Sequence, residues 1–557
     1  MMRDLAVVLL VPLLVAAIAI RYEREGIVTR ISAVIQPLLE SKWLPLVCGV
    51  ISAVVMGWVW IGSHFIPNIA DESAYVLQAQ IFSQGAWTLP ARALPEFFEQ
   101  MHVFVTPFVA AKYFPGESLL LVPGVVAGFA ALVPLLLIFG SGALVFALSR
   151  RLSNGWVALL VWAVWLTARA NLRFLPSYLS ETTTVFLWLL GWWCLYSWHQ
   201  RPRRRMLVLL ALCIGWALIT RPLTGLVFAI PAVAIAVWSA RRRGLMREIG
   251  YAVVVGAAVL AIIPLWSRFT TGRWTETPQA LYTRTYIPWD VIGFGLDTTR
   301  PLRSLPANQA SEINRFKELH QSHTVSSIAS DAMARLSGLR ADVFTSWRTG
   351  LIVFFVLGLF SLTPALVIGA ITALMLFLAY LFYAHPAFWT VYYLEALPVV
   401  AMITVLGFVR ATRWLAKNID SGPPSFDPKP VVGMRAAGAP VAVALALALL
   451  VASLPTIRSE RDLRNRSAAP RLWLWDIMSR LPTNHNLLFV RDDLRNAPRT
   501  LVTNEVDPAS ARTLLAHDLG DENIRLGLAM ADRNAYVIDA GKRTLIALPP
   551  VRESVKP

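Results

Sequence analysis

The chain has 557 residues, of which 56% are hydrophobic and only 15% are charged, and its net charge is +17. Soluble domains carry about 25% charged residues, so this composition excludes a water-soluble globular protein and indicates a polytopic membrane protein. The basic residues come in bursts between apolar segments, as in "RPRRR" from Arg201 and "RRRGLMR" from Arg241. That pattern is typical of cytoplasmic loops, so the positive charge favours a topological role over nucleic-acid binding.

About twelve apolar segments approach the length of about 20 residues that crossing a bilayer requires. They are Leu5–Ile20, Trp43–Ile66, Ser118–Leu148, Trp156–Ala168, Thr182–Trp198, Met206–Leu218, Leu223–Trp238, Ile249–Trp266, Thr345–Leu362, Ala365–Tyr383, Leu394–Phe408 and Pro440–Leu454. We therefore predict an all-α polytopic membrane protein with about 12 transmembrane helices. Basic residues follow the first segment, which lacks an obvious cleavage site, so we expect a retained anchor whose N-terminus is outside.

Alternating these crossings brings the basic clusters to one side of the membrane, which the positive-inside rule makes the cytoplasm. The other side then collects ionisable residues from distant parts of the chain: Asp71, Glu72, Lys112, Arg169, Arg173, Glu181, Arg221, His385 and Glu395. Charges at membrane depth are costly and tend to mark functional sites. We therefore expect a functional site on the external face.

Three regions are predicted. Residues 1–42 form an N-terminal anchor helix and a cytoplasmic segment, and residues 43–455 form the transmembrane domain, with long external loops at 67–117 and 269–344. Residues 456–557 alternate apolar stretches such as "HNLLFVRDD" and "AYVIDA" with the helical stretch "DPASARTLLAHDLG". This alternation predicts a small external α/β domain.

The stretch "NIADESAYVLQAQ" sets two adjacent carboxylates, Asp71 and Glu72, directly after an apolar segment. Such a pair can simply begin a helix, by capping its first turn or by interacting with the helix dipole. At the edge of the bilayer, however, the low dielectric strengthens the effect of any charge. A carboxylate in that place can also accept a proton from a hydroxyl nucleophile as a general base.

This stretch resembles the Asp-Glu motif in the first external loop of GT-C glycosyltransferases, polytopic enzymes that take a sugar from a polyprenyl-phosphate-linked donor. The branch it resembles contains protein O-mannosyltransferases, lipid A aminoarabinose transferases and Rgt-type lipopolysaccharide sugar transferases. Three further stretches are similar to that branch: "AAKYFPGESLLL", "ALITRPLTG" and "HPAFWTVYYLEALP". The resemblance extends from about Trp43 to Phe408 and implies a GT-C-like membrane domain.

The resemblance implies a role for particular residues. Asp71, with Glu72 beside it, would be the catalytic acid pair, and Asp71 the general base that activates the acceptor. The donor phosphate would be bound by Lys112, Arg221, His385 and Tyr392. Each of these four also has an ordinary interpretation, as a snorkelling lysine, a helix-end arginine, an interfacial histidine and a membrane-belt tyrosine.

The sequence departs from the lipid A branch at one position. That branch has an acid directly before the loop lysine, where this chain has Ala111. Glu99 or Glu96 could supply a second acid in space. No cofactor is implied with certainty, and the sequence leaves open whether Asp71 and Glu72 hold a divalent metal.

Together these features predict an inverting membrane glycosyltransferase in the bacterial inner membrane, with the N-terminus and the C-terminal domain on the periplasmic side. Its partners would be the lipid-linked donor, a glycolipid, glycan or protein acceptor, and the bilayer, but not nucleic acid. One alternative is a polytopic transporter or lipid flippase, although transporters usually hold ionisable groups near the bilayer midplane. Another is a non-catalytic envelope assembly protein. The sequence does not identify the sugar, the acceptor, the oligomeric state or the role of the C-terminal domain.

Overall fold

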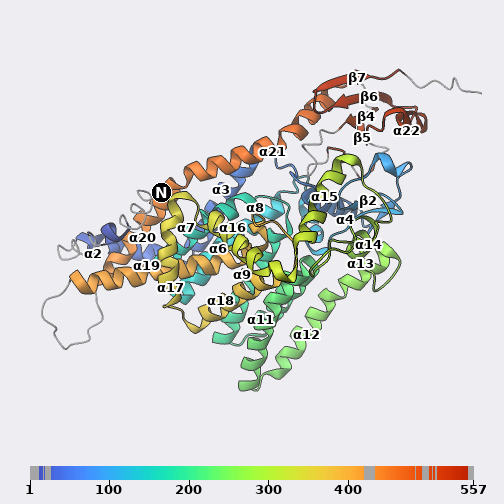
Figure 1. The fold of residues 1–557 in the computed structure, drawn as a ribbon. Helices are drawn as coiled ribbons and strands as arrows, with labels where there is room; N and C mark the ends of the chain where they lie inside the picture. Colours follow the sequence, from blue (N-terminus) through green and yellow to red (C-terminus); the bar gives the residue numbers. More distant parts are fainter. Residues whose placement is uncertain are drawn as a thin grey trace, which may run out of the picture.

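The computed structural model describes residues 12–16, 18, 27–419, 433–482, 485–491, 501–504, 506–507 and 511–549. The described chain is an elongated bundle of helices with a small sheet at the far end of a long helix (Figure 1). The helices of its first half are α2 Ile27–Glu40, α3 Leu44–Ile61, α4 Ala70–Ser83, α5 Gly116–Val126, α6 Leu132–Leu152, α7 Gly155–Leu166, α8 Arg169–Phe174, α9 Ser180–Gln200, α10 Arg204–Thr220, α11 Pro222–Arg242, α12 Met246–Leu260 and α13 Ile262–Thr271. Those of its second half are α14 Pro278–Tyr286, α15 Ala307–Ser322, α16 Ile328–Val343, α17 Leu351–Leu359, α18 Pro364–Tyr380, the 3₁₀ segment η4 Thr390–Ala396, α19 Leu397–Ile419, α20 Gly433–Ala452, α21 Leu454–Arg480 and α22 Asn523–Ala529.

Six helical runs in the described part of the chain are long and apolar enough to cross a membrane, or seven if one bent pair counts as a span. They confirm an integral membrane protein but not the twelve predicted spans. Several predicted segments form helices that are too short, including α7 and α18. The predicted span Ser118–Leu148 is two helices, α5 and α6, separated near Gly128, whose φ of 73° is left-handed. Most of the predicted anchor Leu5–Ile20 lies outside the described residues.

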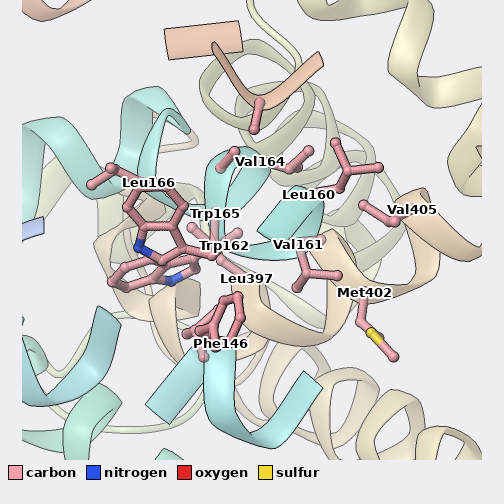
Figure 2. Packing of buried hydrophobic residues seen from close by; sticks show 14 of the residues in the cluster. Phe146, Leu160, Val161, Trp162, Val164, Trp165, Leu166, Leu397, Met402 and Val405 are labelled. Carbon is pink, nitrogen blue, oxygen red and sulfur yellow. The ribbon is translucent and has the colours of Figure 1, made fainter. Parts of the chain in front are cut away.

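The centre of the bundle is α7, whose sequence "GWVALLVWAVWL" is apolar on every side. A helix that is hydrophobic all round is buried all round, and Trp162 and Trp165 are 2% and 1% exposed. Figure 2 shows these indoles among side chains of the neighbouring helices, including Phe146 from α6 and Leu397 from α19. This packing fixes the relative positions of the helices whose ends form the site described below.

The two ends of the bundle differ in charge. At one end Arg151 of α6 donates to Ser197 Oγ at 2.6 Å, Arg204 pairs with Glu248 at 2.7 Å, and Arg243 donates to the His199 carbonyl at 2.6 Å. These basic residues are those of the predicted cytoplasmic clusters. The opposite end holds α4, the start of α9, the α10–α11 turn and η4. The segregation agrees with the predicted topology, while the orientation in the membrane stays a prediction.

Two sheets lie beyond the bundle. In the first loop, β3 (Phe108–Ala111) pairs antiparallel with both β1 (Leu89–Pro90) and β2 (Val103–Phe104). In the tail, β4 (Asn486–Arg491) is parallel to β5 (Thr513–His517) and to β6 (Asn534–Asp539), and β7 (Thr544–Ala547) pairs antiparallel with β6. The predicted strands in "HNLLFVRDD" and "AYVIDA" are therefore present as β4 and β6, whereas the stretch "DPASARTLLAHDLG", predicted to be helical, instead contains the strand β5. Residues 456–480, expected to begin the α/β domain, instead belong to α21, which continues the helical run of α20.

Candidate active site

Asp71 lies in the first turn of α4, where the helix dipole favours a negative charge. It does not cap the helix, because the N-cap residue is Ile69. Tyr113 Oη donates a hydrogen bond to Asp71 Oδ1 at 2.5 Å, and His102 Nε2 lies 3.7 Å from Oδ2. The Asp71 side chain is still 37% exposed. This carboxylate is therefore oriented by two aromatic side chains and open to an incoming group.

Glu72, the second acid of the pair, has different surroundings. It is 2% exposed and accepts a hydrogen bond from the backbone N–H of Tyr178 at 3.2 Å. Burial raises the pKa of Glu72, and the nearby charges of Arg464 and Arg471 oppose that shift. Glu72 thus ties the start of α4 to the segment before α9 and to α21, which favours a role in holding Asp71 in place.

Lys112 follows β3 and forms an ion pair that the sequence did not predict. Its Nζ lies 3.3 Å from Asp290 Oδ2 and 5.3 Å from the ring centroids of both Tyr113 and Tyr282. Asp290 Oδ1 accepts a hydrogen bond from Tyr383 Oη at 3.0 Å. Burial opposes ionisation of Asp290, but the Lys112 ammonium prevails and holds the pKa of that carboxyl well below its usual range. The acid beside the loop lysine is thus Asp290, between α14 and α15.

The two acids that were expected to fill that place contact other groups. Glu99 pairs with Arg303 and accepts a hydrogen bond from Tyr286 Oη at 3.3 Å. Glu96 pairs with Arg525 of the tail at 3.1 Å. They were predicted because they lie near Lys112 in sequence. In the structure their side chains instead hold the loop against α14, the α14–α15 connection and the tail.

Arg221 lies in the tight turn between α10 and α11, where Pro222 begins the next helix with its φ already fixed. Its guanidinium forms an ion pair with Glu181, in the first turn of α9. Nη2 donates to Tyr380 Oη at 2.6 Å, and the guanidinium carbon lies 5.2 Å from the ring centroid of Tyr392. Because a guanidinium carries five N–H donors, these contacts leave capacity for an anion.

Two residues were predicted to contact phosphate, His385 and Tyr392. They differ in whether their side chains already have hydrogen-bond partners within the protein. Nδ1 of His385 donates to the Pro386 carbonyl at 2.9 Å, and Nε2 lies 3.0 Å from Tyr393 Oη, so both ring nitrogens have partners. Burial lowers the pKa of His385 to about 3. Tyr392 stacks on Tyr380 with a centroid separation of 4.7 Å and lies beside Arg221. Tyr392 therefore remains a candidate contact, whereas His385 is occupied in holding its own turn.

A chain of contacts connects Asp71 with Arg221. Tyr113, the hydrogen-bond partner of Asp71, stacks on Tyr75 with a centroid separation of 4.6 Å. Tyr75 Oη donates to Ser180 Oγ at 3.1 Å, and the next residue, Glu181, pairs with Arg221. The acid and the guanidinium, which are 150 positions apart in the sequence, thus belong to one cluster at the same end of the bundle.

A mostly apolar pocket lies against α9, the helix that begins with Ser180 and Glu181 of this cluster. It is lined by side chains of four helices and of η4: Val145, Leu148, Ser149, Leu152, Trp188, Leu189, Trp192, Leu366, Gly369, Ala373, Glu395, Pro398, Val399 and Met402. Glu395 accepts a hydrogen bond from Thr184 of α9 and is, with Ser149, one of the polar residues in this mostly apolar lining. Among the described residues, no group of three or more His, Cys, Asp or Glu side chains is arranged to hold a metal ion.

Known proteins resemble this chain in part of its sequence and in its fold. Residues 117–267 match the family model for dolichyl-phosphate-mannose-protein mannosyltransferase. The crystal structure of ArnT from Cupriavidus metallidurans bound to undecaprenyl phosphate superposes with a TM-score of 0.50 and 14% identity, over 90% of this chain and 93% of ArnT. The crystal structure of the same ArnT in the apo state superposes with a TM-score of 0.43 and 15% identity, over 88% of this chain and 92% of ArnT. No curated protein sequence matches this chain. The family model and the superposition on ArnT bound to undecaprenyl phosphate confirm the predicted GT-C fold.

Proposed function

We propose that this integral membrane protein is a glycosyltransferase that moves a sugar from a polyprenyl-phosphate-linked donor to an acceptor at the bilayer surface. The observation that carries the proposal is the joining of an accessible carboxylate, Asp71, to Arg221 through Tyr113, Tyr75 and the Ser180–Glu181 pair. The fold shared with ArnT, which was crystallised with undecaprenyl phosphate, supports it. So does the family match over residues 117–267, a range that includes Arg221.

The donor would bind with its isoprenoid chain in the apolar pocket between α6, α9, α18 and α19, because a long hydrocarbon needs a lipid-like lining. Its phosphate would then lie near Arg221, whose planar fork can bind two phosphate oxygens at once. Lys112 would add a second positive charge, and Tyr392 a hydroxyl. Arg221 and Lys112 are each paired with a carboxylate in the structure, Glu181 and Asp290 respectively. These ion pairs keep both side chains positioned in a largely buried site.

The reaction would be a single displacement with inversion. The acceptor oxygen attacks the anomeric carbon, Asp71 takes the acceptor's proton, and the bond from that carbon to the phosphate oxygen breaks. Polyprenyl phosphate leaves with a negative charge that Arg221 and Lys112 stabilise, a form of electrostatic assistance that often contributes most to catalysis. A positioned general base contributes a further factor of about 10² to 10⁴ in rate.

The cluster lies at the end of the bundle that the positive-inside rule assigns to the outside, so transfer would occur on the periplasmic face of a bacterial inner membrane. The acceptor could be a glycolipid, a glycan or a protein. The ionisable residues of the candidate site gather at this one end and not near the bilayer midplane, which supports interfacial chemistry over the transport mechanism kept as an alternative.

Mass spectrometry of envelope glycans tests the function whichever sugar is transferred. Deleting the gene should remove one sugar mass from a glycan or glycolipid, and the wild-type protein should restore it. Purified protein should also bind undecaprenyl phosphate, the product of donor consumption. Unchanged glycan masses after deletion, in cells that produce the protein, would reject the proposal.

A further inference from the structure

The tail sheet packs directly on the first loop of the membrane domain. Phe97 and Phe98, 0% and 3% exposed, share a buried cluster with Leu487 and Phe489 of β4 and with further side chains of the tail. Phe97 and Phe489 meet edge to face, with ring centroids 6.1 Å apart. The loop residues therefore depend on the tail for their hydrophobic core.

Polar contacts fix the same loop segment, residues 95–102. His517 of β5, which is buried, donates from Nε2 to the Glu99 carbonyl at 2.7 Å. Gln309 Nε2 donates to the same carbonyl oxygen at 3.1 Å. Arg525, just after the start of α22, forms the ion pair with Glu96. A carbonyl that accepts two buried hydrogen bonds is costly to move, because a donor left unpaired loses its water as well as its partner.

The other end of this segment reaches the catalytic carboxylate. His102 has a φ of 70°, in the left-handed region, which is unfavourable for a non-glycine residue and persists only where its surroundings impose it. Tyr282 Oη accepts a hydrogen bond from the His102 N–H at 2.8 Å, and the Lys112 N–H donates to the His102 carbonyl at 2.9 Å. The His102 ring then lies beside Asp71, with Nε2 at 3.7 Å from Oδ2.

The His102 imidazole is suited to orient a base without neutralising it. Burial and the charge of Lys112 lower its pKa to about 4, so the ring is neutral near pH 7 and carries one proton. Nδ1 is buried without a hydrogen-bond partner in the described part of the chain, whereas Nε2 faces the carboxylate. A proton on Nε2 places an N–H towards Asp71 and leaves that carboxylate its negative charge.

We propose that the C-terminal sheet is a positioning element of the active site, which acts through residues 95–102 to hold His102 against Asp71 and against Lys112. The tail is connected to α4 as well, since Val506 shares a buried cluster with Ala74 of that helix. His102, His517 and Arg525 are positioning residues, because none of them needs to touch the substrate. The inference rests on the proposed function, since the base that is positioned is the one assigned there.

The test uses the full-length protein and a variant set in the tail. His517→Ala removes the donor to the Glu99 carbonyl, and His517→Gln supplies another N–H in its place. Arg525→Glu, at a half-exposed position that tolerates a new charge, sets a negative charge opposite Glu96. Lys542→Ala, on the exposed β6–β7 turn, is the matched control.

Three quantities are measured for each variant: the rate at which the sugar mass reappears on the glycan in deletion cells, the affinity of purified protein for undecaprenyl phosphate, and hydrogen exchange of residues 96–104. His517→Ala and Arg525→Glu should slow transfer about tenfold or more, since a displacement of about 1 Å can cost that much, while affinity changes less than about threefold. Exchange of residues 96–104 should become faster in both. His517→Gln should recover most of the rate, and the control should match wild type.

Wild-type transfer rates in both His517→Ala and Arg525→Glu would overturn the inference, as would faster exchange of residues 96–104 without slower transfer. An equal loss in the Lys542→Ala control, or none recovered by His517→Gln, would assign the effect to general destabilisation and also overturn it. Failure of the wild-type protein itself to restore the sugar would reject the proposed function instead. In that case the exchange measurement would still report whether the tail holds the loop.

Discussion

Replacing Asp71 by asparagine removes the proposed base with little change in shape. The amide keeps an oxygen that can accept from Tyr113 Oη, and α4 keeps its N-cap, because Ile69 and not Asp71 occupies that position. Loss of the favourable interaction with the helix dipole costs about 0.3 to 1 kcal/mol. Asp71 is 37% exposed and its neighbour His102 is neutral near pH 7, so no buried ion pair is broken. Folding should therefore survive.

The effect on catalysis should be far larger. A positioned general base contributes about 10² to 10⁴ in rate, which corresponds to about 3 to 5 kcal/mol in the activation free energy. We expect Asp71→Asn to lower transfer by this factor while undecaprenyl phosphate still binds, because the phosphate contacts come from Arg221 and Lys112. The assay is the rate of glycan modification in deletion cells, normalised to the amount of protein in the membrane.

The matched control is Glu276→Gln, which removes another loop carboxylate, paired with Arg284 at 2.7 Å. It should leave transfer near the wild-type rate. If Asp71→Asn retained more than about a tenth of wild-type activity, the residue would not be the base, given the usual contribution of that group. A parallel loss of membrane-inserted protein would show that the residue serves folding instead.

Three further outcomes are expected. Arg221→Lys keeps the charge but loses the planar fork, so affinity for undecaprenyl phosphate should fall about tenfold, and an unchanged dissociation constant would contradict the phosphate role. Gly116→Ala should lower the melting temperature in detergent, because a Cβ there would collide with Thr220 Oγ1, whereas Gly250→Ala, with nothing within 4 Å, should not. The folded-state pKa of His102 lies below the unfolded value of about 6.5, so its contribution to stability is complete above that pH and is lost as pH falls towards about 4. His102→Gln should thus flatten the decline of thermal stability between pH 6.5 and about 4, and an equally steep decline would contradict the neutral assignment.

Part of this arrangement could be predicted from the sequence, because the order of apolar segments and basic clusters along the chain indicates on which side of the membrane each residue lies. Alternating the apolar segments assigned Asp71, Lys112 and Arg221 to one end of the bundle, where the structure has them. Helix lengths were harder to predict, since the apolar run from Ser118 to Leu148 hides the left-handed Gly128 that divides it. Hydropathy alone does not register such a turn.

The partners of the charged residues could not be predicted, because they depend on tertiary contacts. Asp290 is 178 positions from Lys112 and belongs to the predicted external loop 269–344, in which no residue was predicted to be part of the site. Its one signal was the apolar context of "YIPWD", which marks a carboxylate set among buried side chains. Glu96 and Glu99 were predicted as a second acid because they lie near Lys112 in sequence. The loop folds so that Glu96 pairs with Arg525 of the tail and Glu99 pairs with Arg303.

The contact between His517 and Glu99 spans 418 positions, and it has a consequence for biogenesis. Domains generally fold as the chain emerges, N-terminal parts first, so Asp71 and the helices around it would be inserted well before β5 is synthesised. Until that strand packs on the loop, the nascent protein would have the apolar pocket and Asp71, but the segment that holds His102 would lack its contacts with the tail. If the proposed function and orientation hold, transfer would therefore begin only after the tail has crossed the membrane and packed on the first loop. A chain interrupted before that point would insert without consuming donor.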